Sequence, residues 1–121
     1  MRGRIAIIDD SQTVLAWAEQ LLSKAGYEVF TCHGAMGAGA FLVRVQPTLI
    51  LCDLDMPLLS GEEFIGIIRR SPRLRHSTIV VLSSLEEGAL NDVAAGCGAD
   101  GWIQKTKDGD EFVEQVMGFM S

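Results

Sequence analysis

Three short apolar runs are each followed directly by a residue with a reactive polar side chain, and this pattern constrains the fold more than any other. The residues that directly follow the runs at 5–8, 49–52 and 79–82 are Asp9 with Asp10, Asp53 and Ser83. Uninterrupted aliphatic runs of this length favour strands that are covered on both faces of a parallel sheet. Because the carboxyl ends of parallel strands share one edge, where ligands bind, the three runs predict one converging site.

The whole chain alternates between strand-like runs and helical stretches. Strands are predicted near residues 4–8, 28–31, 48–52, 78–83 and 101–104. Helices are predicted over residues 12–25, 35–45, 60–70, 87–95 and 108–120. Strands that alternate with helices in this way form βαβ units with right-handed crossovers. The predicted fold class is therefore α/β, a doubly wound (βα)5 three-layer sandwich around a parallel five-stranded sheet.

Local signals set several of the predicted helix ends. Ser11 and Ser60 are typical N-cap residues, and Gly26 is placed to end the first helix. The second helix is the weakest prediction, because Gly37 and Gly39 each cost about 1 kcal/mol relative to alanine. Only the regular alternation of strands and helices favours a helix there.

Composition limits the domain organisation and the class of partner. A chain of 121 residues is the size of one domain, so we expect a single domain over residues 1–121. The 16 acidic and 10 basic residues give a formal net charge of −6, which disfavours a nucleic-acid surface built on bulk charge. The sequence has no apolar stretch long enough for a membrane span, and its three cysteines lack zinc-ligand spacing. We expect no signal peptide, because the first residues lead into too few apolar ones. We expect a cytoplasmic protein without direct nucleic-acid or membrane contact.

The carboxylates at the strand ends predict a divalent cation. Asp9, Asp10 and Asp53 would raise one another's cost of ionisation unless a cation joined them. An all-oxygen ligand set favours Mg²⁺ or Mn²⁺, and no His or Cys is expected in a ligand position at a strand end.

The same groups suit phosphoryl chemistry. An aspartate can act as the nucleophile that forms an acyl phosphate, and here Asp53 is the candidate. The Ser83 hydroxyl and the Lys105 ammonium, which follows the fifth strand, can bind phosphoryl oxygens. Taken alone, Asp9 and Asp10 would be equally typical of a solvated turn. Asp53 and Lys105 also follow predicted strands and would lie at the same edge of the sheet, which favours a binding site over a solvated turn.

Four motifs, in this order on a five-unit α/β chain, resemble the receiver domain of two-component response regulators over essentially the whole length. The motifs are Asp9-Asp10-Ser11, Asp53-Leu54-Asp55-Met56-Pro57 with Gly61, Leu82-Ser83-Ser84, and Gly98-Ala99-Asp100-Gly101-Trp102-Ile103-Gln104-Lys105. The resemblance implies a flavodoxin-like fold of the CheY-like superfamily with strand order 2-1-3-4-5. It also implies a phosphoprotein of phosphorelay signalling.

The resemblance also assigns roles to single residues. Asp53 would be phosphorylated by a sensor histidine kinase or a phosphotransfer protein. Asp10 would bind Mg²⁺ directly, Asp9 largely through water, and Asp55 through its backbone carbonyl. Ser83 and Lys105 would hold the phosphoryl group. Ser83 and Trp102 would be the switch residues. Phosphorylation would remodel the face made by the fourth helix, fifth strand and fifth helix, through which a downstream partner or a second copy could bind.

The chain departs from the family pattern near the last strand. Thr106 follows the lysine where the family usually has a proline, and Trp102 stands where the family usually has tyrosine or phenylalanine. Two alternatives to a phosphoacceptor stay open. One is a pseudo-receiver, a binding module that keeps the fold without using phosphate. The other is a phosphatase of the haloacid dehalogenase type, because Asp53-Leu54-Asp55 resembles its DxD motif.

Two remaining features carry weaker predictions. Four arginines with His76 lie in one short segment, at positions 69, 70, 73 and 75. Such a segment is usually a solvated loop, and otherwise a docking patch for an acidic partner. His33 and His76 are both predicted to be surface residues away from the site.

Overall fold

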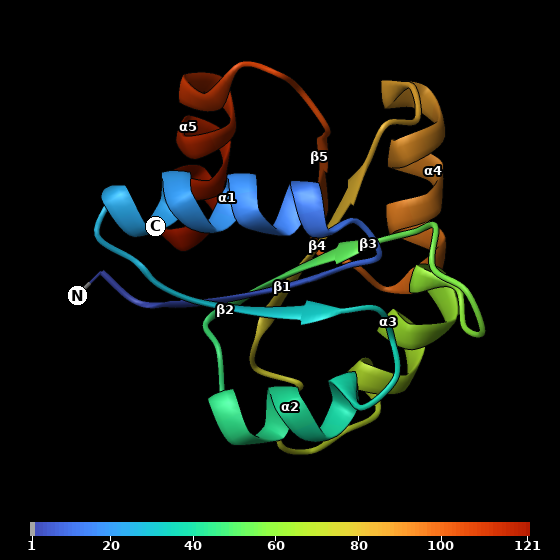
Figure 1. Cartoon of the computed structure of the whole chain (residues 1–121). Helices are drawn as coiled ribbons and strands as arrows, with labels where there is room; N and C mark the ends of the chain where they lie inside the picture. The colour runs from blue at the N-terminus through green and yellow to red at the C-terminus, as the bar shows by residue number, and fades with distance from the viewer. Residues whose placement is uncertain (1) are drawn as a thin grey trace.

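The computed structural model describes residues 2–121 and contains a five-stranded parallel sheet with helices on both faces (Figure 1). The strands are β1 (Arg4–Asp9), β2 (Glu28–His33), β3 (Leu49–Asp53), β4 (Thr78–Ser83) and β5 (Gly101–Gln104). The helices are α1 (Gln12–Lys24), α2 (Ala38–Val45), α3 (Gly61–Arg69), α4 (Glu87–Cys97) and α5 (Gly109–Met120). The predicted α/β class is confirmed.

The strand order is β2-β1-β3-β4-β5, and every neighbouring pair is parallel. The chain leaves β1 toward one edge of the sheet and returns on its other side as β3. The winding direction therefore reverses between β1 and β3, and such a switch point opens a crevice at the carboxyl ends of the two strands. Asp9 ends one of these strands and Asp53 ends the other.

Two apolar clusters hold the helices on the sheet. Alternate residues of a strand point to opposite faces, so Ile5 and Ile7 of β1 join one cluster and Ala6 and Ile8 join the other. The first cluster is covered by α1 and α5, and the second by α2, α3 and α4, as the two groups of helices in Figure 1 show. All five residues of β3 are buried, as expected for a central strand covered on both faces.

The predicted elements are all present, and their ends differ in ways that have local causes. The second helix begins at Ala38 rather than near residue 35, because Gly37 has a left-handed φ of 74° that a helix cannot contain. Gly98, with a φ of 88°, ends α4 after Cys97, two residues later than predicted. The second strand extends to His33 because it pairs with β1 up to Asp9. This extension matters for the site.

No helix within residues 2–121 is long and apolar enough to cross a membrane.

Candidate functional site

Asp9, Asp53 and Lys105 meet at the carboxyl edge of the sheet. The Lys105 Nζ lies 3.2 Å from Oδ2 of Asp9 and 3.2 Å from Oδ1 of Asp53. Asp9 is fully buried and Asp53 is 3% exposed, whereas the lysine side chain reaches in from a partly exposed position. The lysine ammonium thus bridges two buried carboxylates that come from different strands.

The start of α1 fixes the Asp9 carboxylate. Its Oδ1 accepts a hydrogen bond from the backbone N–H of Ser11, at 2.9 Å. Ser11 is the N-cap of α1, and its hydroxyl accepts a hydrogen bond from the Val14 N–H. The other oxygen, Oδ2, is buried and accepts no well-directed hydrogen bond within residues 2–121, so its 3.2 Å contact with Lys105 is ionic. One oxygen of Asp9 is therefore anchored, and the other is left for a cation.

Burial and charge shift two pKa values at this site. Burial raises the pKa of Asp9, and the Asp53 charge raises it further, against the lowering effects of the Ser11 N–H and of Lys105. Burial alone would lower the pKa of Lys105, but the charges of Asp9 and Asp53 outweigh it and the pKa is raised. The lysine therefore stays protonated, and the two carboxylates are not fully compensated by it.

The loop between β3 and α3 closes tightly on the nucleophile candidate. A Cβ at Gly61 would lie 2.0 Å from the Asp53 carbonyl oxygen and 2.8 Å from the Cα of Leu54, so only glycine fits. The Gly61 N–H donates to the Leu54 carbonyl at 3.1 Å. Ser60 caps α3: its hydroxyl accepts from the Glu63 N–H and donates to the Glu63 carboxylate.

Ser83 ends β4 beside this cluster and is 1% exposed. Its hydroxyl accepts a hydrogen bond from the Leu85 N–H at 3.2 Å, and its carbonyl accepts from the Lys105 N–H at 2.7 Å. Gln104 donates to the Leu85 carbonyl at 2.9 Å. The backbone after β4 is thus tied to the backbone after β5, which places the hydroxyl and the ammonium on the same edge.

The two remaining residues predicted for the metal, Asp10 and Asp55, are exposed. Asp10 faces His33, whose Nε2 lies 2.8 Å from the Asp10 carbonyl oxygen and 3.7 Å from its Oδ1. His33 is exposed, as predicted, but the prediction that it does not lie at a strand end facing the site was wrong. It rested on a second strand ending at residue 31, whereas β2 pairs with β1 until His33 lies opposite Asp9. The alternation of apolar and polar residues continues to His33, and this signal could have extended the predicted second strand to that residue.

The donor set at this edge fits a hard divalent cation. The Asp9 Oδ2 is buried and accepts no hydrogen bond within residues 2–121, with only the Lys105 ammonium beside it, and oxygen ligands are those that Mg²⁺ and Mn²⁺ prefer. Three or more His, Cys, Asp or Glu side chains do not gather as a ready metal site within residues 2–121. Asp10 would have to turn from His33 toward Asp9 to complete one, and Lys105 would have to share Asp53 with the cation. The ligand assignments therefore stay predictions.

Trp102 lies near the start of β5, opposite Val81 of β4. It is partly buried against the cluster covered by α2, α3 and α4. It lines a hollow of about 490 Å³ beside α4 together with Ala94 and Phe119. Thr106 stands where the family pattern has a proline, and the residues from 2 to 121 are joined by trans peptide bonds only. The switch role of Trp102 stays a prediction.

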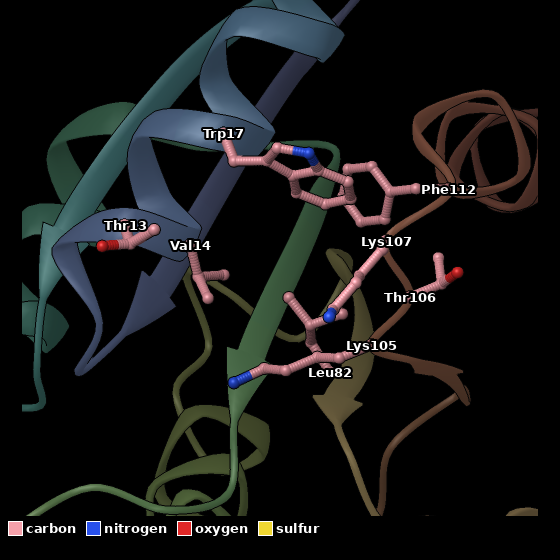
Figure 2. A pocket seen from close by; sticks show the side chains of 8 residues that line it. All are labelled: Thr13, Val14, Trp17, Leu82, Lys105, Thr106, Lys107 and Phe112. Atoms are coloured by element: carbon pink, nitrogen blue, oxygen red, sulfur yellow. The ribbon is translucent and has the colours of Figure 1, made fainter.

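An apolar pocket of about 360 Å³ adjoins the lysine on its other side, between α1 and α5 (Figure 2). Trp17 and Phe112 pack at a ring distance of 4.8 Å and form its upper wall. Lys105 and Lys107 border this pocket in Figure 2, so the site lysine lies between the carboxylates and an apolar pocket.

The fold and the site together define a doubly wound α/β domain with a carboxylate and lysine site at its β1/β3 switch point. The model of the response regulator receiver domain family matches residues 5–117. The chain therefore belongs to the response regulator receiver domain family of two-component signalling, whose members work with histidine kinases or phosphotransfer proteins. The resemblance stated from the sequence motifs is confirmed.

Individual relatives agree with this family. The chain is 30% identical to Protein PilG of Pseudomonas aeruginosa over 115 residues, which cover 93% of this chain and 84% of that protein. Among solved structures, the chemotaxis response regulator CheY4 of Vibrio cholerae superposes with a TM-score of 0.88, at 23% identity, over 96% of this chain and 97% of that one. The response regulator TrrA of Thermotoga maritima, solved in complex with Mg²⁺-BeF, gives a TM-score of 0.82 at 26% identity over 96% and 97%.

Proposed function

We propose that this chain is a phosphoacceptor switch in which Asp53 receives a phosphoryl group from the phosphohistidine of a sensor kinase or phosphotransfer protein. The observation that carries the proposal is the 3.2 Å contact between the Lys105 ammonium and the Asp53 carboxylate at the switch point of the sheet. An ammonium next to a nucleophilic carboxylate can pair with the charge that a transferred phosphoryl group brings.

The transfer balances without a general base on the protein. An oxygen of Asp53 attacks phosphorus, a P–O bond forms while the P–N bond of the phosphohistidine breaks, and the leaving imidazole nitrogen takes up a proton. Lys105 would move from the carboxylate to a phosphoryl oxygen, and the Ser83 hydroxyl would exchange its bond with the Leu85 N–H for one to the phosphoryl group. Later attack by water returns inorganic phosphate and Asp53, so the domain is a signalling domain with slow self-dephosphorylation.

Asp53 must become more accessible before transfer. Its side chain is 4% exposed, and the neighbouring Leu54 and Met56 are buried with it. The exposed part of the surrounding edge is formed by Asp10 and Asp55, which lie on the two flanking loops. We infer that displacement of Lys105 from Asp53 uncovers the attacking oxygen, because the ammonium lies 3.2 Å from the Asp53 carboxylate.

A bound Mg²⁺ would offset the charge of the carboxylates and of the phosphoryl oxygens. Asp10 would bind it directly and Asp9 largely through water at its Oδ2, which accepts no hydrogen bond within residues 2–121, and Asp53 and the backbone carbonyl of Asp55 would complete the set. Mn²⁺ has the same ligand preference and would serve as a replacement. The complex that the relative TrrA forms with Mg²⁺-BeF supports this assignment.

The test is phosphorylation by a small donor, which needs no cognate kinase. The protein is incubated with Mg²⁺ and acetyl phosphate or phosphoramidate, and its intact mass is measured. We expect one phosphoryl adduct, which Asp53→Asn abolishes and EDTA prevents. Asp55→Asn, which leaves the backbone carbonyl in place, serves as the matched carboxylate control and should keep the adduct. An adduct that survives in Asp53→Asn would contradict the proposal.

The pseudo-receiver is the second candidate, and it also has an observation in its favour. Lys105 already forms ion pairs with both Asp9 and Asp53, and Asp53 is nearly inaccessible. A binding module that does not use phosphate would show no adduct with either donor under any Mg²⁺ concentration. The phosphatase alternative is disfavoured because Asp53 lies on β3 within a chain that belongs to the receiver family.

We further propose that phosphorylation is read out on the face formed by α4, β5 and α5. Trp102 lines the hollow on this face. Its strand is joined to Ser83 because the backbone N–H of Lys105, directly after β5, donates a hydrogen bond to the Ser83 carbonyl. Fluorescence of Trp102 in a Trp17→Phe background, recorded with and without beryllofluoride and Mg²⁺, tests the movement. An unchanged spectrum in a protein that does form the adduct would leave phosphorylation standing and exclude a Trp102 switch.

A further inference from the structure

The basic residues of this acidic protein are concentrated on the segment that joins α3 to β4. From Phe64 to Leu85 the sequence contains no Asp or Glu, although the chain has 16 of them. Four of the ten Lys and Arg residues lie within this segment, at positions 69, 70, 73 and 75. The rest of the chain is therefore strongly acidic, and the segment is a local region of opposite sign.

Arg69 differs from the other three arginines because its side chain is used inside the fold. It donates to the Gly98 carbonyl at 2.7 Å and to the Ser77 carbonyl at 3.2 Å, and it forms an ion pair with Asp100. Asp100 in turn accepts from the Ile79 N–H at 2.8 Å. Arg69 thus holds the end of α3 against the starts of β4 and β5, and it is not available to a partner.

The other three arginines have no such role. Arg70, Arg73 and Arg75 are exposed, as is His76 beside them. Within the described part of the chain, these three guanidinium groups take part in no hydrogen bond or ion pair. Guanidinium groups that the fold leaves unpaired keep all their donors for carboxylate or phosphate oxygens, which they bind in bidentate fashion. We call these three residues the arginine patch.

The backbone beneath the arginine patch is well fixed. Leu74, between Arg73 and Arg75, is 2% exposed and belongs to the core cluster. The N–H groups of Leu74 and Arg75 both donate to the Ser71 carbonyl at 3.1 Å. The Ser77 hydroxyl, which is buried, donates to the Pro47 carbonyl at 2.8 Å. Three arginines therefore project from an anchored turn rather than from a mobile linker, which lowers the entropy that binding would cost.

The arginine patch lies at the amino edge of the sheet. Its turn leads into the start of β4, next to the chain that enters β3, where Thr78 N–H donates to the Thr48 carbonyl at 2.9 Å. Asp53 ends β3 and Lys105 directly follows β5, so both lie at the opposite, carboxyl edge. A partner on the arginine patch would therefore leave the phosphoacceptor site open, and both could be occupied together.

The charge distribution selects the kind of partner. Nucleic acid and an anionic membrane are extended polyanions. Their negative charges would also lie against the surface outside the patch, and a protein with a net charge of −6 would repel them there. A short acidic segment covers the patch alone, and interactions beyond about 8 Å are screened at physiological salt. Ile67, 48% exposed and one helical turn before Arg70, adds an apolar contact of the kind that a polypeptide can use. We propose that the arginine patch binds a carboxylate-rich segment of another protein.

The test uses an end-blocked oligoglutamate peptide as the probe and the full chain as the receptor. Binding is followed by amide chemical shifts, at about 20 mM and about 200 mM salt. We expect shifts confined to residues 67–77 that weaken at the higher salt, and no change at Asp53. Arg73→Gln/Arg75→Gln should lower the affinity about tenfold.

A charge-matched control separates the patch from general electrostatics. Lys24→Gln/Arg44→Gln removes two exposed cations from elsewhere and changes the net charge equally. We expect this variant to bind the peptide as the parent does. Equal weakening in both variants, absence of shifts at residues 67–77, tighter binding to a DNA duplex or to phosphatidylglycerol vesicles at the same salt, or self-association that only the arginine variant abolishes would each overturn the proposal.

Discussion

The Lys105 ammonium lies 3.2 Å from the Asp53 carboxylate although 52 residues separate them in the sequence. The contact exists because β3 and β5 flank β4 and all three run in the same direction, so that their carboxyl ends meet. Within residues 2–121, the only other carboxylate that Lys105 contacts is that of Asp9. One ammonium thus pairs with two buried carboxylates and compensates their charge only in part. The remaining negative charge lowers the stability of the metal-free protein and favours the binding of a cation.

Asp9→Asn should make the metal-free protein more stable, by about 1 kcal/mol, because an amide removes a buried charge that Lys105 only partly compensates. The Asn oxygen can still accept from the Ser11 N–H. Urea unfolding with and without Mg²⁺ measures both effects. We expect Mg²⁺ to stabilise the parent and to have little effect on the variant; a variant that Mg²⁺ stabilises equally would remove Asp9 from the ligand set.

Gly61→Ala should destabilise the domain by about 2–4 kcal/mol, because the added Cβ meets the backbone of Asp53 and Leu54. Gly66→Ala is the control in the same helix, since a Cβ there meets nothing within 4 Å. That change should stabilise by about 0.5–1 kcal/mol through helix propensity. Thermal or urea unfolding of the two variants should shift in opposite directions, and shifts of the same sign would refute the packing argument.

Leu58→Asn should stabilise the domain by about 0.5–1 kcal/mol, because Leu58 is in the left-handed region with a φ of 74° and asparagine tolerates that region better. Little burial is lost, since Leu58 is 86% exposed. Leu59→Asn is the neighbouring control, because Leu59 packs against the core cluster and the same change there should destabilise the domain. Unfolding midpoints of the pair decide the matter.

Arg69→Gln should cost about 1–3 kcal/mol, because the Gly98, Ser77 and Asp100 acceptors lose their shared donor. Arg70→Gln, at the exposed neighbouring position, should change the free energy of unfolding by less than about 0.5 kcal/mol. Hydrogen exchange adds a local reading: we expect faster exchange at the Ile79 amide in the Arg69 variant only. Equal stability losses in both variants would count against the internal role of Arg69.

Leu85→Glu should shorten the life of the phosphorylated state, roughly 2- to 10-fold, because a carboxylate beside Ser83 could accept a proton from the attacking water. Leu85 is 42% exposed and its backbone is held at both ends, so the substitution should not disturb the fold. Loss of the adduct is timed by intact mass after removal of acetyl phosphate. Leu58→Glu, on another exposed loop, is the charge control; equal lifetimes in the parent and Leu85→Glu would show that a carboxylate at position 85 does not assist the attacking water.

The fold could be predicted closely because each element carried its own local signal. The apolar run ending at Cys52 indicated a strand buried on both faces, and Cys52 is fully buried as predicted; burial raises the pKa of its thiol well above the usual range, so it is an unreactive packing residue. The start of the second helix and the end of the second strand were missed. Gly37 in a left-handed conformation decided the first, and pairing with β1 up to His33 decided the second.

By itself, the sequence determined the α/β class, the strand ends that carry Asp9, Asp53 and Ser83, and the family to which the motifs belong, because strand periodicity, helix caps and motif order are local properties. Only the tertiary structure decided that Lys105 bridges Asp9 and Asp53, that Asp10 faces His33, and that Arg69 is bound while the arginine patch is not. Such pairings depend on strand order and register, which join residues far apart in the chain and leave no trace in their local sequence.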